Sequence, residues 1–499
     1  MNLQPYLSRP SIVLTIWSLY HLIVWTLLPL ACNTCLPLDC IEAVMWGSEW
    51  QWGYDKHPPL SAWAAQLFAM ALGDAGVYLL SQLCIISAGL GIYALGKLLK
   101  LSTLQSLLAV LLLDTIYFYQ FISVEFNVNY LQLPFWAWGW YFGIRGSLQK
   151  NPINWIALGV CVGLGALTKY IAVLLLIPLF AAWYRRGELK ETLTSYGIYL
   201  AGMVSILLFL PHFLWMKSND WMTLTYGIRR GASDETFFWH HLWHPVEFIL
   251  SQFGILLPLL LLCFLCRRKN RETTSPRNGA KELCLTAYAS IVIISALTGI
   301  SPVTMWAVPM PLAIGLWLVP ASQLERSVKK CLWTVAALSF VFTTAYAVTF
   351  GAGPVIRERP HRVNYPGVAL VQAVEQTWNE RNESPLFIVI ADEFLGGIVN
   401  HYSPDQPQVM IRANLQRSRT LSDELVSQQG ALVLWLKSRK ASDPHHAPLS
   451  RVYPDLESRF PQLVSLPDLL IPWPRRTDQK IGRYGIAYIP PKKLESAHD

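Results

Sequence analysis

The feature that most constrains this chain is a series of apolar runs, each close to the length that crosses a lipid bilayer. A transmembrane helix needs about 20 mostly apolar residues. Because so many runs approach this length, the sequence predicts a mainly α, polytopic helical membrane protein with about eleven transmembrane helices. The predicted spans are residues 11–31, 76–97, 103–121, 127–144, 152–168, 170–184, 196–216, 246–266, 283–300, 303–320 and 331–350.

The composition agrees with a membrane protein. Of the 499 residues, 53% are hydrophobic and 14% are charged, and the mean hydropathy is +0.33. Soluble proteins average about 25% charged residues. Many of the 21 Trp lie near the ends of apolar runs, as at membrane interfaces. These features exclude disorder, a coiled coil and a single soluble domain, and the net charge of +8 fits cytoplasmic loops better than nucleic-acid binding.

Lys and Arg are unevenly distributed between alternate loops, which predicts the orientation. With the N-terminus in the cytoplasm, the outer loops hold Lys56, Lys169, Lys217, Arg229 and Arg230. We predict an odd number of spans, no cleaved signal peptide after residues 11–31, and a C-terminus outside. The predicted cytoplasmic loops hold Arg9, Lys97, Lys100, Arg145, Lys150, Arg185, Arg186, Lys190, Arg267, Arg268, Lys269, Arg271, Arg277, Lys281, Arg326, Lys329 and Lys330.

The composition changes near residue 351. Residues 351–499 carry 18 of the 40 basic and 16 of the 32 acidic residues and contain no run of spanning length. Short apolar runs at 385–391 and 430–437 are typical of buried strands. We therefore predict a transmembrane domain over residues 1–350 and a small extracytoplasmic α/β domain over residues 351–499. We find no P-loop, which argues against an ATP-driven pump.

The first outer loop, residues 36–63, is rich in carboxylates: Asp39, Glu42, Glu49 and Asp55. Asp39 and Glu42 are three residues apart, so they share one face of a helix. We expect residues 43–46 to carry that helix along the membrane surface. Ordinary solvated loop charges are the alternative interpretation.

The same loop holds two basic side chains next to a rigid backbone. Lys56 and His57 precede Pro58 and Pro59, and proline fixes its own φ and restricts the preceding residue. A cation held at the edge of the bilayer in this way suits a lipid phosphate.

Two further segments carry polar residues near the predicted outer face. Glu125, Asn127 and Asn129 come where a short turn enters the fourth span, and they either line the same pocket as Asp39 or cap the helix. Lys169 interrupts an apolar stretch, where it either contacts a phosphate or extends to the interface.

The outer loop at residues 211–245 allows two interpretations. Arg229 and Arg230 suit an anionic substrate, because Arg binds phosphate in a bidentate manner. His240 and His244 share an i, i+4 face as metal ligands can, but interleaved Trp and Phe favour interfacial packing.

A pair of cysteines follows the first span. Cys32 and Cys35 could be redox active or zinc-binding. We favour packing or a local disulfide, with no catalytic role.

Several of these motifs resemble bacterial PMT-like glycosyltransferases, the glycosyltransferase family 39 proteins of the GT-C superfamily, which are related to protein O-mannosyltransferases and lipid A aminoarabinose transferases. The likeness covers most of the chain and is most specific in the first outer loop. The usual adjacent Asp-Glu pair is replaced by Asp39 and Cys40, with Glu42 nearby. The matching motifs are Asp39…Glu42-Ala43…Trp46…Gly53-Tyr54…His57-Pro58-Pro59-Leu60…Trp63, Phe126-Asn127-Val128-Asn129, Gly163-Leu164-Gly165…Thr168-Lys169-Tyr170, and the segments at 211–215, 219–221 and 401–404.

The resemblance implies a GT-C fold and an inverting transfer of one sugar from a polyprenyl-phosphate carrier, at the outer face of a bacterial inner membrane. The acceptor would be lipid A, lipopolysaccharide or another envelope glycan. The resemblance implies no certain cofactor, and a divalent metal ion is an open alternative. The implied catalytic residues are Asp39 and Glu42; the donor phosphate would contact Lys56, His57, Lys169, Tyr170, Arg229 and Arg230; and Tyr54, Asp55, Glu125, Asn127 and Asn129 would line the pocket.

Two other classes of protein share some of these features. A transporter or flippase of lipid-linked sugars also has many spans and charges within the membrane. It is expected to show broken helices at corresponding positions of two halves, and we see no such symmetry. A non-catalytic scaffold is the third interpretation, and the carboxylate cluster argues against it.

Overall fold

The computed structural model describes residues 9–231, 237–266, 279–356, 361–438, 447–475 and 481–492. Within these residues, seven helical segments are long and apolar enough to cross a membrane, and three apolar helices are shorter. The predicted polytopic helical membrane protein with a C-terminal α/β domain is therefore confirmed. The basic residues Arg267, Arg268, Lys269, Arg271 and Arg277, which contribute to the predicted orientation, lie outside the described residues.

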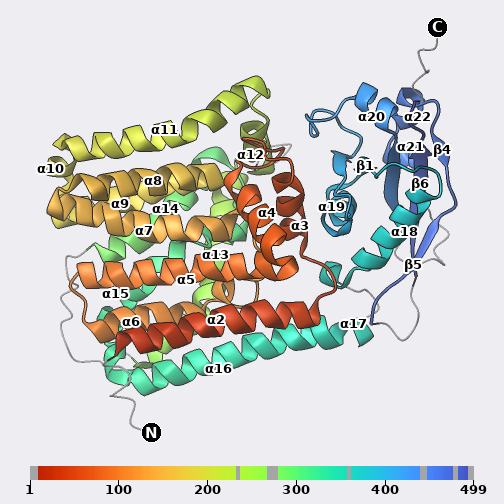
Figure 1. Ribbon diagram of the computed structural model, residues 1–499. Helices are drawn as coiled ribbons and strands as arrows, with labels where there is room; N and C mark the ends of the chain where they lie inside the picture. The colour runs from red at the N-terminus through yellow and green to blue at the C-terminus, as the bar shows by residue number, and fades with distance from the viewer. Residues whose placement is uncertain are drawn as a thin grey trace. The chain divides into compact units, whose positions relative to one another are not determined.

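Helices make up most of the chain (Figure 1). The α-helices before the α/β domain are α2 (Pro10–Cys32), α3 (Leu38–Gly47), α4 (Leu60–Leu72), α5 (Asp74–Leu98), α6 (Thr103–Leu111), α7 (Val128–Gln149), α8 (Pro152–Thr168), α9 (Leu176–Arg186), α10 (Leu189–Thr194), α11 (Tyr196–Ser218), α12 (Met222–Gly231), α13 (His240–Cys266), α14 (Ala280–Thr298), α15 (Ile314–Ser322), α16 (Val328–Tyr346) and α17 (Gly353–Ile356).

The chain forms two compact units. The first contains residues 1–29, 52–61 and 75–346, and the second contains residues 30–51, 62–74 and 347–499. The second unit thus includes part of the first outer loop as well as the C-terminal region. The boundary predicted at residue 350 stays a prediction.

Close packing of small residues brings α8 against α11 in the first unit, where Figure 1 shows α7, α8 and α11 side by side. At Gly159 in α8, an added Cβ atom would lie 2.5 Å from the carbonyl oxygen of Ala201 in α11. At Gly163, one turn later, it would lie 3.0 Å from Leu208. Small residues at such positions let two helix backbones approach closely, as is common inside membranes.

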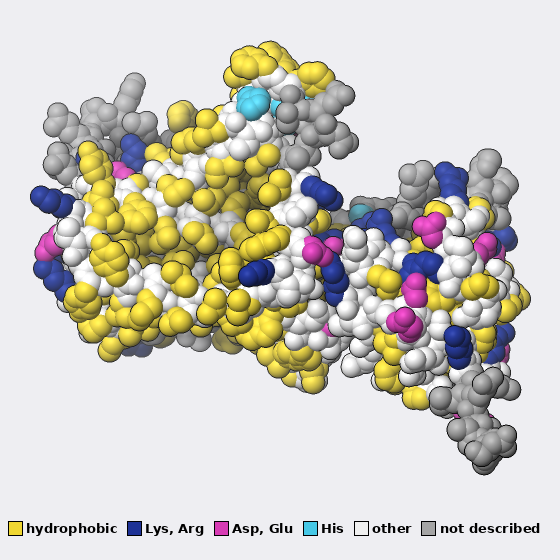
Figure 2. Space-filling view, turned by 90° about the horizontal axis from the view of Figure 1, so that it is seen from above, with side chains coloured by type: hydrophobic (Ala, Val, Ile, Leu, Met, Phe, Trp, Pro, Cys, Tyr) yellow, Lys and Arg dark blue, Asp and Glu magenta, His cyan; other side chains and the backbone are white. Residues whose placement is uncertain are grey.

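Many large apolar side chains of the helical unit face outward. Figure 2 shows hydrophobic side chains spread over its visible surface. Tyr199, Met203 and Ile206 on α11, and Trp333 and Phe340 on α16, are each more than half exposed. Such a large apolar surface suits contact with lipid rather than with water.

The third predicted span differs from expectation. The α-helical part of residues 103–121 ends at Leu111, and two short 3-10 turns follow, η1 (Leu112–Thr115) and η2 (Tyr117–Tyr119). A capping box formed by Ser102 and Gln105 fixes the start of α6. The early end coincides with Asp114, whose side chain bonds to α2 instead of facing lipid.

The C-terminal part of the second unit is built on a six-stranded mixed sheet. The strand order is β2-β1-β3-β6-β4, and β5 pairs with β6. β1 runs parallel to β2 and β3, whereas β6 runs antiparallel to β3, β4 and β5. Both apolar runs predicted as strands are found, as β1 and β3. The elements are α18 (Gly367–Asn379), β1 (Ile388–Ala391), α19 (Glu393–Tyr402), β2 (Gln408–Ile411), α20 (Asp423–Gln429), β3 (Ala431–Ser438), α21 (Leu449–Val452), α22 (Leu456–Arg459), β4 (Val464–Ser465), β5 (Leu469–Pro472) and β6 (Ile481–Ile489).

The α8–α11 packing predicts opposite effects of two matched substitutions. Gly159→Ala should lower the free energy of unfolding by about 1–3 kcal/mol, because the new methyl group meets the α11 backbone. Gly202→Ala, where an added Cβ atom meets nothing within 4 Å, should raise it by up to about 1 kcal/mol through helix propensity. Unfolding in detergent measures both, and equal shifts would contradict this account of the packing.

Candidate functional site

The backbone of residues 52–59 is fixed by a hydrogen bond within the loop and by packing against α11. The Tyr54 N–H donates to the carbonyl of His57 at 3.1 Å, and Tyr54 is buried. Gly53 packs against the ring of Trp215 in α11, where an added Cβ atom would lie 2.4 Å from ring carbons. Since Pro58 and Pro59 are also buried, Lys56 and His57 sit on a constrained backbone.

His57 lies among positive charges. Burial and the charges of Lys169, Lys56 and Arg230 together lower the pKa of His57 to about 3. The imidazole is therefore neutral throughout the physiological pH range. A neutral hydrogen-bonding ring among three cations makes an electropositive site that is suited to a phosphate.

Lys169 joins two of the predicted segments. It ends α8 in an extended conformation, and its Nζ donates to Oδ1 of Asn129 at 2.6 Å. The ammonium also lies 5.6 Å from the centre of the Trp306 ring. Asn127 caps α7, because its Oδ1 accepts from the N–H of Asn129 at 2.8 Å. Of the two Asn, Asn127 therefore caps the helix, whereas Asn129 bonds to Lys169.

Tyr170 belongs to a chain of hydrogen bonds that sequence reasoning missed. Nδ1 of His212 donates to the carbonyl of Trp52 at 2.6 Å. In the neutral ring Nε2 then accepts from the Tyr170 hydroxyl at 2.8 Å. The hydroxyl of Thr223 lies 2.5 Å from the same oxygen. This chain links the first loop to α11 and α12. A histidine inside an apolar helix was the available signal for His212.

The remaining predicted residues of this unit have different surroundings. Arg229 and Arg230 are exposed near the end of α12, and Tyr226 of that helix lies edge-on to His57, with ring centres 6.1 Å apart. Glu125 is half-buried in the turn before α7, and Asp55 is half-buried in the first loop.

The histidines of the 237–245 segment fit interfacial packing. The rings of His240 and His244 are stacked 4.6 Å apart. Nδ1 of His241 and Nδ1 of His244 bond the carbonyls of Ala296 and Gly299, each at 2.8 Å. The aromatic side chains around them, Phe237, Phe238, Trp239 and Trp243, are exposed.

The two predicted catalytic carboxylates belong to the second unit. Asp39 is half-buried in the first turn of α3, where the helix dipole favours a negative charge, and Glu42 lies one turn later with 8% of its surface exposed. The expected helix is found. Residues 43–46 are buried, and Met45 lies next to Gly397 of α19. The expectation that they follow the membrane surface stays a prediction.

Glu49 follows α3 and lies in an unusual environment. Its Oε2 accepts from Nε2 of Gln51, and burial raises the pKa of its carboxyl to about 7. The carbonyl of Gln51 in turn accepts from Nε1 of Trp63 at 2.9 Å. Glu49 therefore takes up a proton near neutral pH.

Metal and thiol chemistry have little support in the described geometry. Among the described residues, no three His, Cys, Asp or Glu side chains gather as metal ligands. All nine cysteines of the chain lie within the described residues, and each is buried with a free thiol. Cys32 and Cys35 therefore form no disulfide here, in agreement with packing roles.

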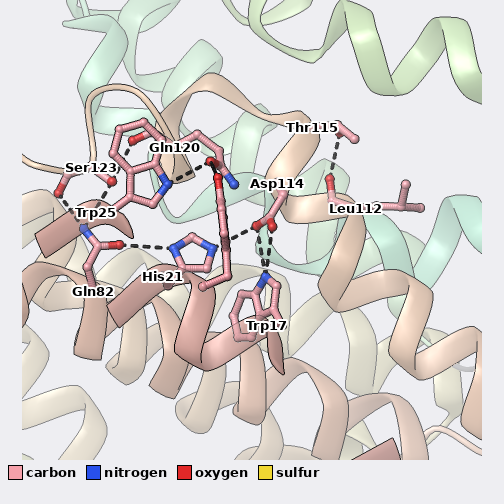
Figure 3. Close-up of polar contacts among 10 residues, drawn as sticks. Trp17, His21, Trp25, Gln82, Leu112, Asp114, Thr115, Gln120 and Ser123 are labelled. Atoms are coloured by element: carbon pink, nitrogen blue, oxygen red, sulfur yellow. Dashed lines mark hydrogen bonds and ion pairs between the residues drawn. The ribbon is translucent and has the colours of Figure 1, made fainter. Parts of the chain in front are cut away.

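A buried polar network inside the helical unit was also missed (Figure 3). Nε1 of Trp17 donates to both carboxylate oxygens of Asp114, at 3.0 and 3.1 Å. His21 lies between Asp114 and Gln82: its Nε2 is 3.0 Å from Oδ1 of Asp114, and its Nδ1 is 3.1 Å from Oε1 of Gln82. Both ionisable side chains are almost fully buried.

The partners in this network fix most of its protons. Nε2 of Gln82 donates to the hydroxyl and the carbonyl of Ser123, so its Oε1 faces His21. Nδ1 of His21 must then carry hydrogen.

The Glu49 environment predicts a pH-dependent stability. The unfolded carboxyl titrates near 4.3, so the folded state binds this proton more tightly and loses stability as the pH rises from about 4 to 7. Glu49→Gln should flatten this dependence and stabilise the protein at pH 8 by roughly 1–3 kcal/mol. Unfolding measured from pH 4 to 8 tests this. The exposed Glu424→Gln is the control, and an unchanged slope in Glu49→Gln contradicts the assignment.

The buried pair predicts a large loss of stability when one partner is removed. Asp114→Asn should cost about 3–5 kcal/mol in unfolding free energy, because His21 then faces an amide instead of a carboxylate. The double variant His21→Gln/Asp114→Asn should recover part of the loss, because it replaces the imidazole that has lost its carboxylate partner. Unfolding in detergent measures both against the exposed Asp455→Asn. A loss below about 1 kcal/mol for Asp114→Asn would show that the pair is dispensable.

Comparison with known proteins supports the sequence resemblance over part of the chain. Residues 56–215 match the model of the dolichyl-phosphate-mannose-protein mannosyltransferase family. No curated protein matches the chain. The matched stretch contains Lys56, His57, Asn129, Lys169 and His212, whereas Asp39 and Glu42 precede it. The match supports a membrane glycosyltransferase in general, and over residues 56–215 the chain resembles a PMT-like enzyme of the GT-C type, as its sequence predicts.

Proposed function

We propose that this protein transfers a single sugar from a polyprenyl-phosphate carrier, such as undecaprenyl phosphate, to an acceptor of the bacterial envelope, with inversion at the anomeric carbon. The observation that carries the proposal is the match of residues 56–215 to the dolichyl-phosphate-mannose-protein mannosyltransferase family. The positive charges of Lys56, Lys169 and Arg230 near His57 support it. Two of these cations lie in the segment that matches a family named for dolichyl-phosphate-mannose chemistry.

The site suits a donor whose sugar is already activated. A lipid-phosphate sugar needs no nucleotide, and its leaving group is a phosphate that gains negative charge as the glycosidic bond breaks. Lys56, Lys169 and Arg230 would stabilise that charge, and His57 and Tyr170 would help to orient the phosphate. The exposed Arg229 would assist at the entrance.

The reaction also needs a base. The acceptor hydroxyl forms a bond to the anomeric carbon as the bond from that carbon to the phosphate oxygen breaks, and the hydroxyl proton passes to a carboxylate. We assign this role to Asp39 and a supporting role to Glu42. General-base catalysis of this kind contributes typically about 10²–10⁴-fold to the rate. Tyr54, Asp55, Glu125, Asn127 and Asn129 would line the sugar pocket.

The proposed acceptor is lipid A, lipopolysaccharide or another envelope glycan. A membrane-embedded architecture suits a lipid acceptor. The proposed location is the bacterial inner membrane, with the N-terminus in the cytoplasm. A transmembrane catalytic domain over residues 1–350 and a periplasmic domain over residues 351–499 complete the proposal.

The assay that tests this function is release of undecaprenyl phosphate from a panel of undecaprenyl-phosphate sugars by purified protein in detergent, with lipid A and lipopolysaccharide as acceptors. Wild type should release the carrier, and Asp39→Asn should lower the turnover number by about 10²–10⁴-fold. The exposed Asp455→Asn should behave as wild type. Full turnover by folded Asp39→Asn would overturn the base assignment, and donor binding without any release would favour a transporter.

A further inference from the structure

The C-terminal part of the second unit holds α3, the helix that carries Asp39 and Glu42. Three residues of α19 contact α3 or the residues next to it. Gly397 faces Ile41, where an added Cβ atom would lie 2.4 Å from Cγ2. One turn later, Nδ2 of Asn400 donates to Oγ of Ser48 at the end of α3, at 3.2 Å. The third contact comes from Tyr402, at the end of α19.

Tyr402 connects the start of α3 to the start of α5. Its hydroxyl accepts from the backbone N–H of Leu36 at 2.9 Å and donates to Oδ2 of Asp74 at 2.9 Å. The other oxygen of Asp74 accepts from Nε2 of His401 at 2.7 Å. Burial and nearby negative charge raise the pKa of Tyr402 well above its usual value, so the hydroxyl keeps the proton that it donates.

This group of three side chains, which we call the clasp (Asp74, His401 and Tyr402), is itself firmly held. Ser403, which follows α19, donates to Glu375 of α18 at 2.7 Å. The His401 side chain is 9% exposed and that of Asp74 27%. Leu36 is fully buried, so its N–H has no water to replace Tyr402.

The backbone before Leu36 is fixed by the same part of the unit. The N–H groups of Thr34 and Cys35 both donate to the carbonyl of Val363, at 2.8 and 3.1 Å. Nδ2 of Asn364 donates to the carbonyl of Cys32 at 3.1 Å. The chain therefore enters α3 along a path determined by residues more than 300 positions later.

We propose that Tyr402, with Asp74 and His401, is a positioning residue for the carboxylates of α3. The hydroxyl sets the backbone at Leu36, three residues before Asp39, and so sets the place of the base. The expected effect on turnover rests on the proposed function, whereas the expected effect on the α3 backbone does not. A misplacement of about 1 Å can cost roughly 10²-fold in rate.

Tyr402→Phe removes only the clasp hydroxyl. We expect faster hydrogen–deuterium exchange at the backbone amides of α3, by about tenfold, because the anchor of Leu36 is lost. We also expect the turnover number to fall about tenfold or more, with the KM for the donor within about threefold of wild type. A positioning role predicts this split, whereas general destabilisation would not confine faster exchange to α3.

The matched control is Tyr488→Phe. The Tyr488 hydroxyl donates to Oδ1 of Asn382 at 2.9 Å, a bond in the same unit that involves none of the three clasp side chains. This variant should leave α3 exchange and turnover unchanged. If Tyr402→Phe does not fold, Asp74→Asn tests the same link, because it weakens the partner of both His401 and Tyr402 while keeping the side-chain size.

The outcomes separate this inference from the proposed function. Unchanged α3 exchange in folded Tyr402→Phe overturns the clasp, whatever the activity. Faster exchange with unchanged turnover overturns the positioning role, provided that Asp39→Asn is inactive in parallel. If Asp39→Asn is fully active, the base assignment fails, and the exchange data still decide whether the clasp holds α3.

Discussion

The helical unit depends on hydrogen bonds between buried polar side chains, which have no water to bond to. Inside a bilayer each unpaired polar group costs several kcal/mol, so polar side chains there must bond to one another. The network of Trp17, His21, Gln82 and Asp114 does this for α2, α5 and the broken third span. Through Ser123 it reaches the turn that precedes α7. The N-terminal end of α7, in turn, supplies Asn129 to Lys169, so a network deep in the bundle supports the segment that forms the cation site.

The chemistry proposed for residues 36–63 is divided between the two units. Asp39, Glu42 and Glu49 belong to the unit that includes the sheet, whereas Lys56 and His57 belong to the helical unit. Between Asp39 and Lys56 the chain passes from one unit to the other at residues 51 and 52. Each half of the chemistry is therefore stabilised by its own unit: the acids by α19, the cations by α11, α12 and the turn at Lys169.

How far the sequence predicts this structure depends on the kind of interaction. Apolar length predicts seven of the eleven expected spans, which correspond to helices long and apolar enough to cross a membrane. The i, i+3 spacing of Asp39 and Glu42 correctly indicates a helix. The pairing of His21 with Asp114 could not be predicted, because each lies alone in an apolar run and 93 residues separate them. His212 could have been noticed as a histidine within an apolar helix, but its partners Trp52 and Tyr170 lie far from it in the sequence. The burial of residues 43–46 was not predicted, because α3 packs on α19, a partner that local sequence does not indicate.

The cysteines have a practical consequence for mapping how this chain crosses the membrane. All nine are buried and none is in a disulfide. A bulky, membrane-impermeant maleimide added to intact cells would therefore find little native thiol to modify. Cysteines introduced one at a time into the loops could then be labelled with little signal from the native cysteines, all of which are retained. The side of the membrane on which each loop lies can thus be determined by labelling. No cysteine-free variant, with altered packing at nine buried positions, is needed first.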